Sequence, residues 1–345
     1  MVHRTIARRA ALGLLAASAL VGAAPAVAQQ AQVNVYTNRE PGLYSATLDE
    51  FTKATGIKVN ALFSEQGLAE RIRAEGANSP ADLLITVDIG RLQEAVDLGI
   101  TQPVRSEVLA ANIPAAYRDP EGHWFGTSLR ARAIYASKER VPDAALTYED
   151  LAAPRWKGKI CTRSGQHQYN IALIAAMIVK NGEARTEEWL RGLKANLAKK
   201  PSGGDRDVAK DIAAGVCDIG LGNQYYIGLL TNSQNADQRR WAEAVKVILP
   251  RFRDGGTHVN VSGAVVARNA PNRDNAVRLL EYLTTPDAQR VLADVNYEYP
   301  VRPGIAVNPL VASFGELRAD PMPVADIAKA RAKASELVDR VGYDR

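Results

Sequence analysis

Short apolar runs alternate with amphipathic stretches between residue 31 and about residue 100. Residues 33–36 (VNVY) and 57–63 (IKVNALF) have the composition and alternation of strands, and the segment between them spaces its apolar residues as a helix does before it stops at Gly56. The run ADLLITVD then predicts a buried strand, and IGRLQEAVDLGI predicts a helix. This order is typical of a doubly wound α/β lobe.

Two long extended segments interrupt the alternation. They are TSLRARAIYAS (127–137) and THVNVSGAVVA (257–267), and α/β patterns continue between them and helices follow them. Two such segments are what a chain needs to cross twice between two lobes. We therefore predict two doubly wound α/β lobes joined by two crossover strands, with the ligand cleft between the lobes. The predicted amino-terminal lobe is 29–130 plus 258–305, and the predicted carboxy-terminal lobe is 131–257 plus 306–345.

The first 28 residues have the composition of an export signal. A basic start with three arginines precedes an apolar stretch over 10–23, and Ala26-Val27-Ala28 is a small-residue cleavage motif. We predict a cleaved signal peptide over 1–28 and a periplasmic protein. A membrane anchor, the alternative, needs about 18 or more uninterrupted apolar residues. Because Arg8 and Arg9 are adjacent, both the Sec and the twin-arginine (Tat) routes stay open.

The positive charge of the chain belongs largely to this leader. The chain has 43 basic residues, three of them in the leader, against 38 acidic residues, so the mature protein is close to neutral. No long Lys/Arg block remains, which argues against a nucleic-acid partner. The sequence gives no reason for oligomerisation, and we expect a monomer.

The chain has two cysteines, Cys161 and Cys217. An even pair in an exported protein is a candidate disulfide, and two buried free thiols are the alternative. A zinc site is less favoured, because neither cysteine has a second cysteine or a histidine at ligand spacing.

Two adjacent tyrosines, Tyr225 and Tyr226, follow a Gly-Asn turn in GNQYYIGLL. On a strand they would point to opposite faces, whereas at the start of a helix they can serve one site. If Asn223 caps that helix, both tyrosines lie in its first turn, where the helix dipole favours a phenolate. The alternative is that the rings pack against the core with their hydroxyls in water.

Several segments together resemble a known family. They are TGIKVN, EGANSPADLLITVD, WFGTSLRARAIY, DLAAPRWKGKI, GNQYYIGLL, GTHVNVSGAVV, NYEYPV and ASFGE. Over residues 31–345 the chain is similar to the periplasmic ferric-iron-binding proteins of ABC importers, the FutA/FbpA-like group with the bilobal class II solute-binding fold. The resemblance implies a carrier that delivers Fe(III) to a membrane permease driven by a cytoplasmic ATPase. It also maps Tyr169 onto the family's other carboxy-lobe tyrosine ligand.

Iron chemistry agrees with a tyrosine site. Fe(III) is a hard cation that prefers anionic oxygen donors to sulfur. A phenol with a pKa near 10 lies about three units from ionisation at pH 7, so three phenolates cost on the order of 12 kcal/mol, which a strongly Lewis-acidic metal must offset. Three phenolates also neutralise a 3+ ion, which favours its burial. A divalent ion is the poorer candidate, although the sequence does not decide whether Fe(II) is also carried.

The first-lobe ligand departs from the family pattern. Family members commonly carry His or Tyr after the first strand, as in YSSRHY, whereas YTNREPGLY here has Glu40 and Pro41 at those positions. Three alternatives stay open: a carboxylate from Glu40, a phenolate from Tyr44, or a water or small anion. The candidates to offset negative charge or to hold a synergistic anion are Arg39, Arg130 and Arg132, and the alternative for the latter two is ordinary salt bridges.

Other chemistry is less favoured. His167 is a candidate ligand or a group that supports a ligand, and the alternative is a solvated loop residue. Asp88 is expected to cap a helix rather than bind metal. Because no nucleophile elbow, phosphate loop or dinucleotide fingerprint is present, we expect no enzyme. The main alternative is another solute on the same fold, namely an organic cation, an oxyanion or a sugar phosphate.

Overall fold

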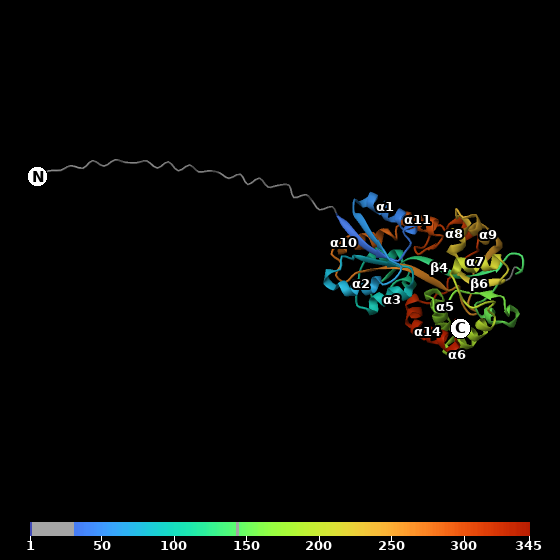
Figure 1. Cartoon of the computed structure of the whole chain (residues 1–345). Helices are drawn as coiled ribbons and strands as arrows, with labels where there is room; N and C mark the ends of the chain where they lie inside the picture. The colour runs from blue at the N-terminus through green and yellow to red at the C-terminus, as the bar shows by residue number, and fades with distance from the viewer. Residues whose placement is uncertain (2–30, 143–144) are drawn as a thin grey trace. The chain divides into compact units, whose positions relative to one another are not determined.

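The computed structural model describes Met1 and residues 31–142 and 145–345 (Figure 1). Apart from Met1, the predicted signal peptide lies outside the described residues. In the part of the chain that is described, no helix is both long enough and apolar enough to cross a membrane.

Parallel strands form one end of a nine-stranded sheet. β1 pairs in parallel with β2 on one side and with β3 on the other. A helix follows each strand, and Asp88 caps the third of these helices by accepting a hydrogen bond of 2.7 Å from the Gly90 amide, so the predicted cap is confirmed. The bounds are β1 (Gln32–Thr37), α1 (Ser45–Thr55), β2 (Lys58–Phe63), α2 (Leu68–Glu75), β3 (Leu83–Thr86) and α3 (Ile89–Asp97).

The two predicted extended segments are the strands β4 (Phe125–Ser137) and β8 (Val259–Val266). β8 pairs antiparallel with β3 and with residues 125–131 of β4, and residues 132–137 of β4 pair with β6 and β7. The strand order is β2-β1-β3-β8-β4-β6-β5, with β7 and β9 also paired to β4. Because the two halves of β4 pair with different strands, this one strand runs through both parts of the sheet. β4 is buried along all thirteen residues. The shorter strands are β5 (Ile160–Cys161), β6 (Ile219–Asn223), β7 (Val245–Ile248) and β9 (Tyr299–Pro300).

Helices pack around the part of the sheet that the carboxy-terminal half of β4 forms with β6 and β7 (Figure 1). α5 carries a continuous run of buried residues from Tyr169 to Met177, as expected of a helix with neighbours on several sides, and it contacts α6, α13 and α14. The bounds are α5 (Gln168–Asn181), α6 (Glu183–Ala195), α7 (Asp205–Ala213), α8 (Tyr225–Thr231), α9 (Ala236–Ala244), α13 (Val324–Lys329) and α14 (Arg331–Val341). The remaining helices are α4 (Glu107–Asn112), α10 (Arg273–Tyr282), α11 (Pro286–Asn296) and α12 (Pro309–Ala312).

The cysteine pair forms a disulfide in this structure. Cys161 ends β5 and Cys217 lies just before β6, with 5.9 Å between their Cα atoms. The bond lies in a small apolar cluster that includes Tyr135, Val208 and Ile227. It therefore ties the end of β5, which leads toward α5, to the segment just before β6, the strand that precedes α8.

Candidate functional site

Three predicted tyrosines come together at the starts of two helices. Tyr169 lies in the first turn of α5, and Tyr225 and Tyr226 begin α8. The hydroxyl oxygens of Tyr169 and Tyr225 are 3.4 Å apart, and the ring centroids of Tyr225 and Tyr226 are 4.2 Å apart. Tyr169 and Tyr225 are 7% and 6% exposed and Tyr226 is half-buried, so the phenols form a compact, largely dry cluster.

Tyr225 and Tyr226 resist ionisation. Burial raises the pKa of Tyr225 well above its ordinary value, the neighbouring phenols Tyr169 and Tyr226 raise it further, and Arg130 acts in the opposite direction. Burial, followed by Tyr169, also raises the pKa of Tyr226. Tyr225 and Tyr226 are therefore neutral at pH 7 without a bound cation, and a Lewis acid that replaces their protons has to bind phenolate strongly.

Guanidinium groups cover the faces of the tyrosine rings. The guanidinium carbons of Arg130 and Arg163 lie 5.3 Å and 5.2 Å from the ring centroid of Tyr169, and that of Arg206 lies 5.0 Å from the ring centroid of Tyr226. Nearby positive charge favours the ionised form of a phenol. Sequence reasoning missed Arg163 and Arg206. Arg163 lies in the loop that leads into α5, shortly before Tyr169, and could have been found by proximity, whereas nothing in the local sequence marks Arg206.

Arg132 is held in an internal network. Its guanidinium donates to Asp205 at 2.7 Å, to Asn170 at 2.7 Å and to Asn223 at 3.1 Å. Burial would raise the pKa of Asp205, but Arg132 and Arg163 hold that pKa below its ordinary value. Arg132 is therefore bound up in a buried ion pair, the alternative that the sequence left open.

The expected helix cap by Asn223 is wrong. Asn223 ends β6, and Gln224 holds the cap position of α8 without a side-chain capping bond. The Gln224 side chain instead accepts from the amide of Ala131 at 2.8 Å and donates to the carbonyl of Tyr297 at 3.0 Å. Long-range contacts to β4 and to the turn after α11, rather than a local cap, therefore position the start of α8.

Arg39 and Arg130 meet around a buried carboxylate. Arg39 donates to Ser262 at 2.8 Å and to Glu298 at 2.9 Å, and Arg130 donates to the same Ser262 hydroxyl at 2.9 Å. The second oxygen of Glu298 accepts from Ser128. Glu298 lies in the NYEYPV segment but was not singled out, because its partner Arg39 is 259 residues away in the chain.

The two first-lobe candidates differ in their surroundings. Glu40 is exposed, and its carboxylate lies 4.0 Å from Arg206, which in turn covers the ring of Tyr226. Tyr44 is 3% exposed, and burial raises its pKa to about 12 although Thr127 and Arg39 lower it. Contacts through Arg206 thus link Glu40 to the tyrosine cluster, whereas Tyr44 is a buried neutral phenol.

Two histidines are neutral and structural. His167 holds the cap position of α5, where its Nδ1 accepts from the Tyr169 amide at 3.2 Å, and burial lowers its pKa to about 3, with Arg163 adding to this effect. His258 is buried, and its pKa is also lowered to about 3, first by burial. His167 is therefore a helix cap rather than the solvated loop residue that was one alternative.

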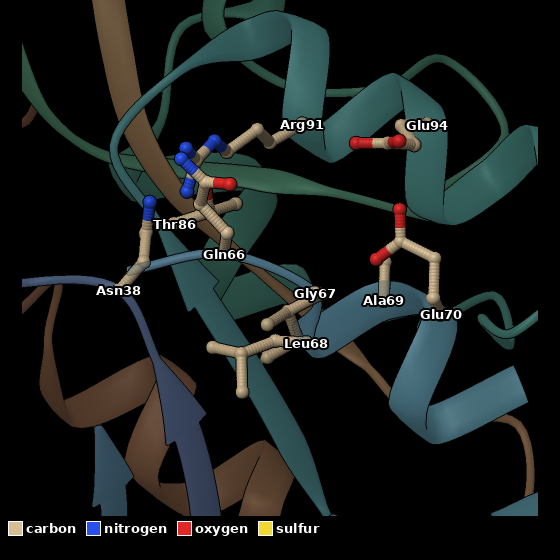
Figure 2. Close-up of a pocket in the computed structure, with 10 residues that line it drawn as sticks. Asn38, Gln66, Gly67, Leu68, Ala69, Glu70, Thr86, Arg91 and Glu94 are labelled. Carbon is tan, nitrogen blue, oxygen red and sulfur yellow. The ribbon is translucent and has the colours of Figure 1, made fainter. Parts of the chain in front are cut away.

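A polar pocket of about 480 Å³ lies at the carboxyl ends of β1 and β3 (Figure 2). Figure 2 shows Asn38, Gln66, Thr86 and Arg91 gathered on one side of it, with carboxylates on the other. Asn38 immediately precedes Arg39, and the buried Oγ1 of Thr86 has no hydrogen-bond partner among the described residues. In open α/β sheets this edge is where ligands bind.

Comparison with known proteins assigns this geometry to a family. Residues 78–329 match the family described as bacterial extracellular solute-binding protein. Iron uptake protein A1 of Synechocystis sp. is 43% identical over 317 residues, which cover 91% of this chain and 88% of that protein. A Bordetella ferric binding protein superposes with a TM-score of 0.86 at 55% identity, over 91% of this chain and 100% of that one. A Trichodesmium protein (IdiA, FutA), solved in complex with iron and citrate, gives a TM-score of 0.87 at 43% identity, over 90% and 99% of the two chains. The predicted class II solute-binding fold is confirmed.

Proposed function

The chain belongs to the family of bacterial extracellular solute-binding proteins, and on that basis we propose that it is an exported carrier of Fe(III). The observation that carries this proposal is the cluster of three tyrosines, of which Tyr169 and Tyr225 place their hydroxyl oxygens 3.4 Å apart. The similarity to an iron uptake protein and to ferric-binding proteins over nine-tenths of the chain supports it. The substrate is the ferric ion itself.

We assign Tyr169, Tyr225 and Tyr226 as phenolate ligands. Oxygen ligands about 2.0–2.2 Å from one ion lie about 2.8–3.6 Å apart at angles between a right angle and the tetrahedral angle. The separation of 3.4 Å between the Tyr169 and Tyr225 oxygens falls within this range. Three phenolates cancel the charge of Fe(III), which limits the desolvation cost of burying it.

A small anion or water near Arg39 and Arg130 completes the shell in this proposal. Arg39 and Arg130 are 3% and 1% exposed, and within residues 31–142 and 145–345 the Nε of each has no hydrogen-bond partner. Glu40 is the weaker candidate because it is exposed and lies beside Arg206. Arg132 is already paired with Asp205.

Delivery follows from the family. Export through a signal peptide over residues 1–28 would place the protein in the periplasm, where it would act as a monomer. Closure of the two predicted lobes would trap the ion, and an ABC permease with its cytoplasmic ATPase would receive it. We propose a binding role rather than catalysis, as in the named relatives.

Equilibrium competition against a ferric chelator tests the proposal. Purified mature protein should retain one ferric ion per chain against an excess of citrate, and a Tyr282→Phe variant, altered on α10, should behave like the wild type. Loss of all iron at low citrate, together with saturable binding of a sugar phosphate or an organic cation, would instead support another solute on this fold.

A further inference from the structure

We propose that Glu298 determines the charge of the anion that this site accepts, a role that rests on the proposed iron-binding function. Glu298 is 1% exposed. Its Oε1 lies 2.9 Å from Nη1 of Arg39 and 3.7 Å from Nη1 of Arg130, and its Oε2 accepts from Ser128. One buried carboxylate is therefore shared between Arg39 and Arg130, and Arg130 also lies over the ring of Tyr169.

The charges in this group do not cancel. Burial would raise the pKa of Glu298, but Arg39 and Arg130 hold it below its ordinary value, so the carboxylate is ionised. Two guanidinium groups and one carboxylate leave one positive charge. Because uncompensated buried charge is costly, this excess favours an anionic ligand at the same place.

Arg39 and Arg130 also have hydrogen-bond donors that are not used by the described residues. Nε and Nη2 of Arg39 and Nε of Arg130 are buried and have no acceptor in the described part of the chain. The same Arg130 guanidinium lies 5.3 Å from the ring centroid of Tyr169, and Arg39 shares Ser262 and Glu298 with Arg130. The free donors thus belong to the tyrosine site, and they fit the oxygens of a small oxyanion or carboxylate.

Glu298 weakens anion binding in proportion to anion charge. The interaction between its carboxylate and a bound anion is repulsive and doubles when the anion carries two charges instead of one. With Glu298 present, the net charge of +1 on Arg39, Arg130 and Glu298 is neutralised by one monoanion. Without it, the excess of two would match a dianion, so Glu298 disfavours doubly charged anions at the iron site.

Glu298→Gln tests this role, because glutamine keeps the shape and can still accept from Arg39 and bond to Ser128. Nitrate and sulfate serve as probes, since they are singly and doubly charged oxyanions that stay ionised near neutral pH. Calorimetry on iron-free protein and the visible absorption of iron-loaded protein report binding, both at constant ionic strength. We expect the affinity for sulfate to rise at least about tenfold more than the affinity for nitrate.

Two further variants separate charge from structure. The double variant Arg39→Gln/Glu298→Gln has the same net charge of +1 as the wild-type group. It should therefore return the sulfate-to-nitrate preference toward the wild-type value. Arg39→Gln alone removes one positive charge and should lower sulfate affinity more than nitrate affinity, which keeps the proposal testable if Glu298→Gln does not fold. Glu75→Gln is the matched control, because Glu75 also binds an arginine and a serine, Arg71 and Ser79, outside this group.

The outcomes are distinguishable. Equal changes for sulfate and nitrate in Glu298→Gln would show a purely structural role and overturn the proposal, as would the absence of anion binding in both wild type and variant. If the protein binds no iron, the proposed function fails, and the titrations of iron-free protein still decide the role of Glu298.

Discussion

At the scale of single residues, the site combines groups that oppose one another. Burial disfavours ionisation of Tyr225 and Tyr226, while Arg130, Arg163 and Arg206 lie close enough to stabilise phenolates once a metal has displaced the protons. Without iron, Tyr225 and Tyr226 are therefore protonated, and iron binding at these phenols is coupled to proton release.

The tyrosine assignment predicts a large difference between two Tyr→Phe substitutions. Tyr226→Phe removes a ligand and should weaken iron binding by roughly 100-fold or more, since loss of an outer-shell partner alone costs about 10–100-fold. Tyr44→Phe removes a buried hydroxyl of the same chemistry outside the cluster and should change affinity far less. Chelator competition measures both, and equal, negligible losses would contradict the assignment.

The raised phenol pKa values predict a steep pH dependence. Because the folded, iron-free protein holds protons on these phenols well above pH 7, binding releases them, and affinity falls as pH falls. The loss can reach about tenfold per pH unit for each phenol displaced. Competition at pH 5 and at pH 8, corrected for chelator protonation, measures this, and the same affinity at both would rule out phenolate ligation.

Local sequence revealed the tyrosines but not their electrostatic partners. Tyr225 and Tyr226 are adjacent in the chain and follow a turn, which is a readable signal. Glu298 and Asp205 bind arginines that lie 259 and 73 residues away, so only the folded chain brings these charges together. Asn223 was misread because a local capping pattern lost to tertiary contacts made by Gln224.

At the scale of elements, the short helix α8 depends on close contact with the turn after α11. A Cβ on Gly228 would overlap the ring of Tyr297, whose backbone is left-handed with φ of 56°. The Tyr297 carbonyl also accepts from Gln224 at the start of α8. The two tyrosines that begin α8 are thus positioned by this packing.

Gly228→Ala should therefore damage the site. Alanine improves helix propensity by about 1 kcal/mol, but overpacking costs typically about 1–3 kcal/mol, and the contact here is with ring and Cβ atoms that are fixed by the backbone. We expect lower iron affinity and a lower melting temperature. Gly42→Ala, where nothing lies within 4 Å of the added Cβ, is the control. A Gly228→Ala protein that is more stable and binds iron normally would disprove the packing argument.

The hydrophobic pattern of the sequence predicted strands and helices correctly where it extended over many residues. The predicted extended segments 127–137 and 257–267 correspond to β4 over 125–137 and β8 over 259–266. Pairing could not be predicted, because the partners of β4 lie in strands from 219 to 300, and no local pattern encodes register across such separations. The division into two lobes stays a prediction.

At the scale of the whole molecule, iron should stabilise the fold. A ligand that binds only the native state raises the free energy of unfolding by about 4 kcal/mol when its free concentration is 1,000 times the dissociation constant. Removal of iron by a chelator should lower the melting temperature of the wild type accordingly and should have little effect on Tyr226→Phe. An unchanged melting temperature in the wild type would speak against tight binding.

The most direct test of the central claim is a visible absorption spectrum recorded during titration of the mature protein with ferric citrate. The tyrosine site predicts a broad phenolate-to-iron charge-transfer band that saturates at one iron per chain and weakens in Tyr226→Phe. The absence of any such band at saturating iron would contradict tyrosine ligation and would point to another solute at this site.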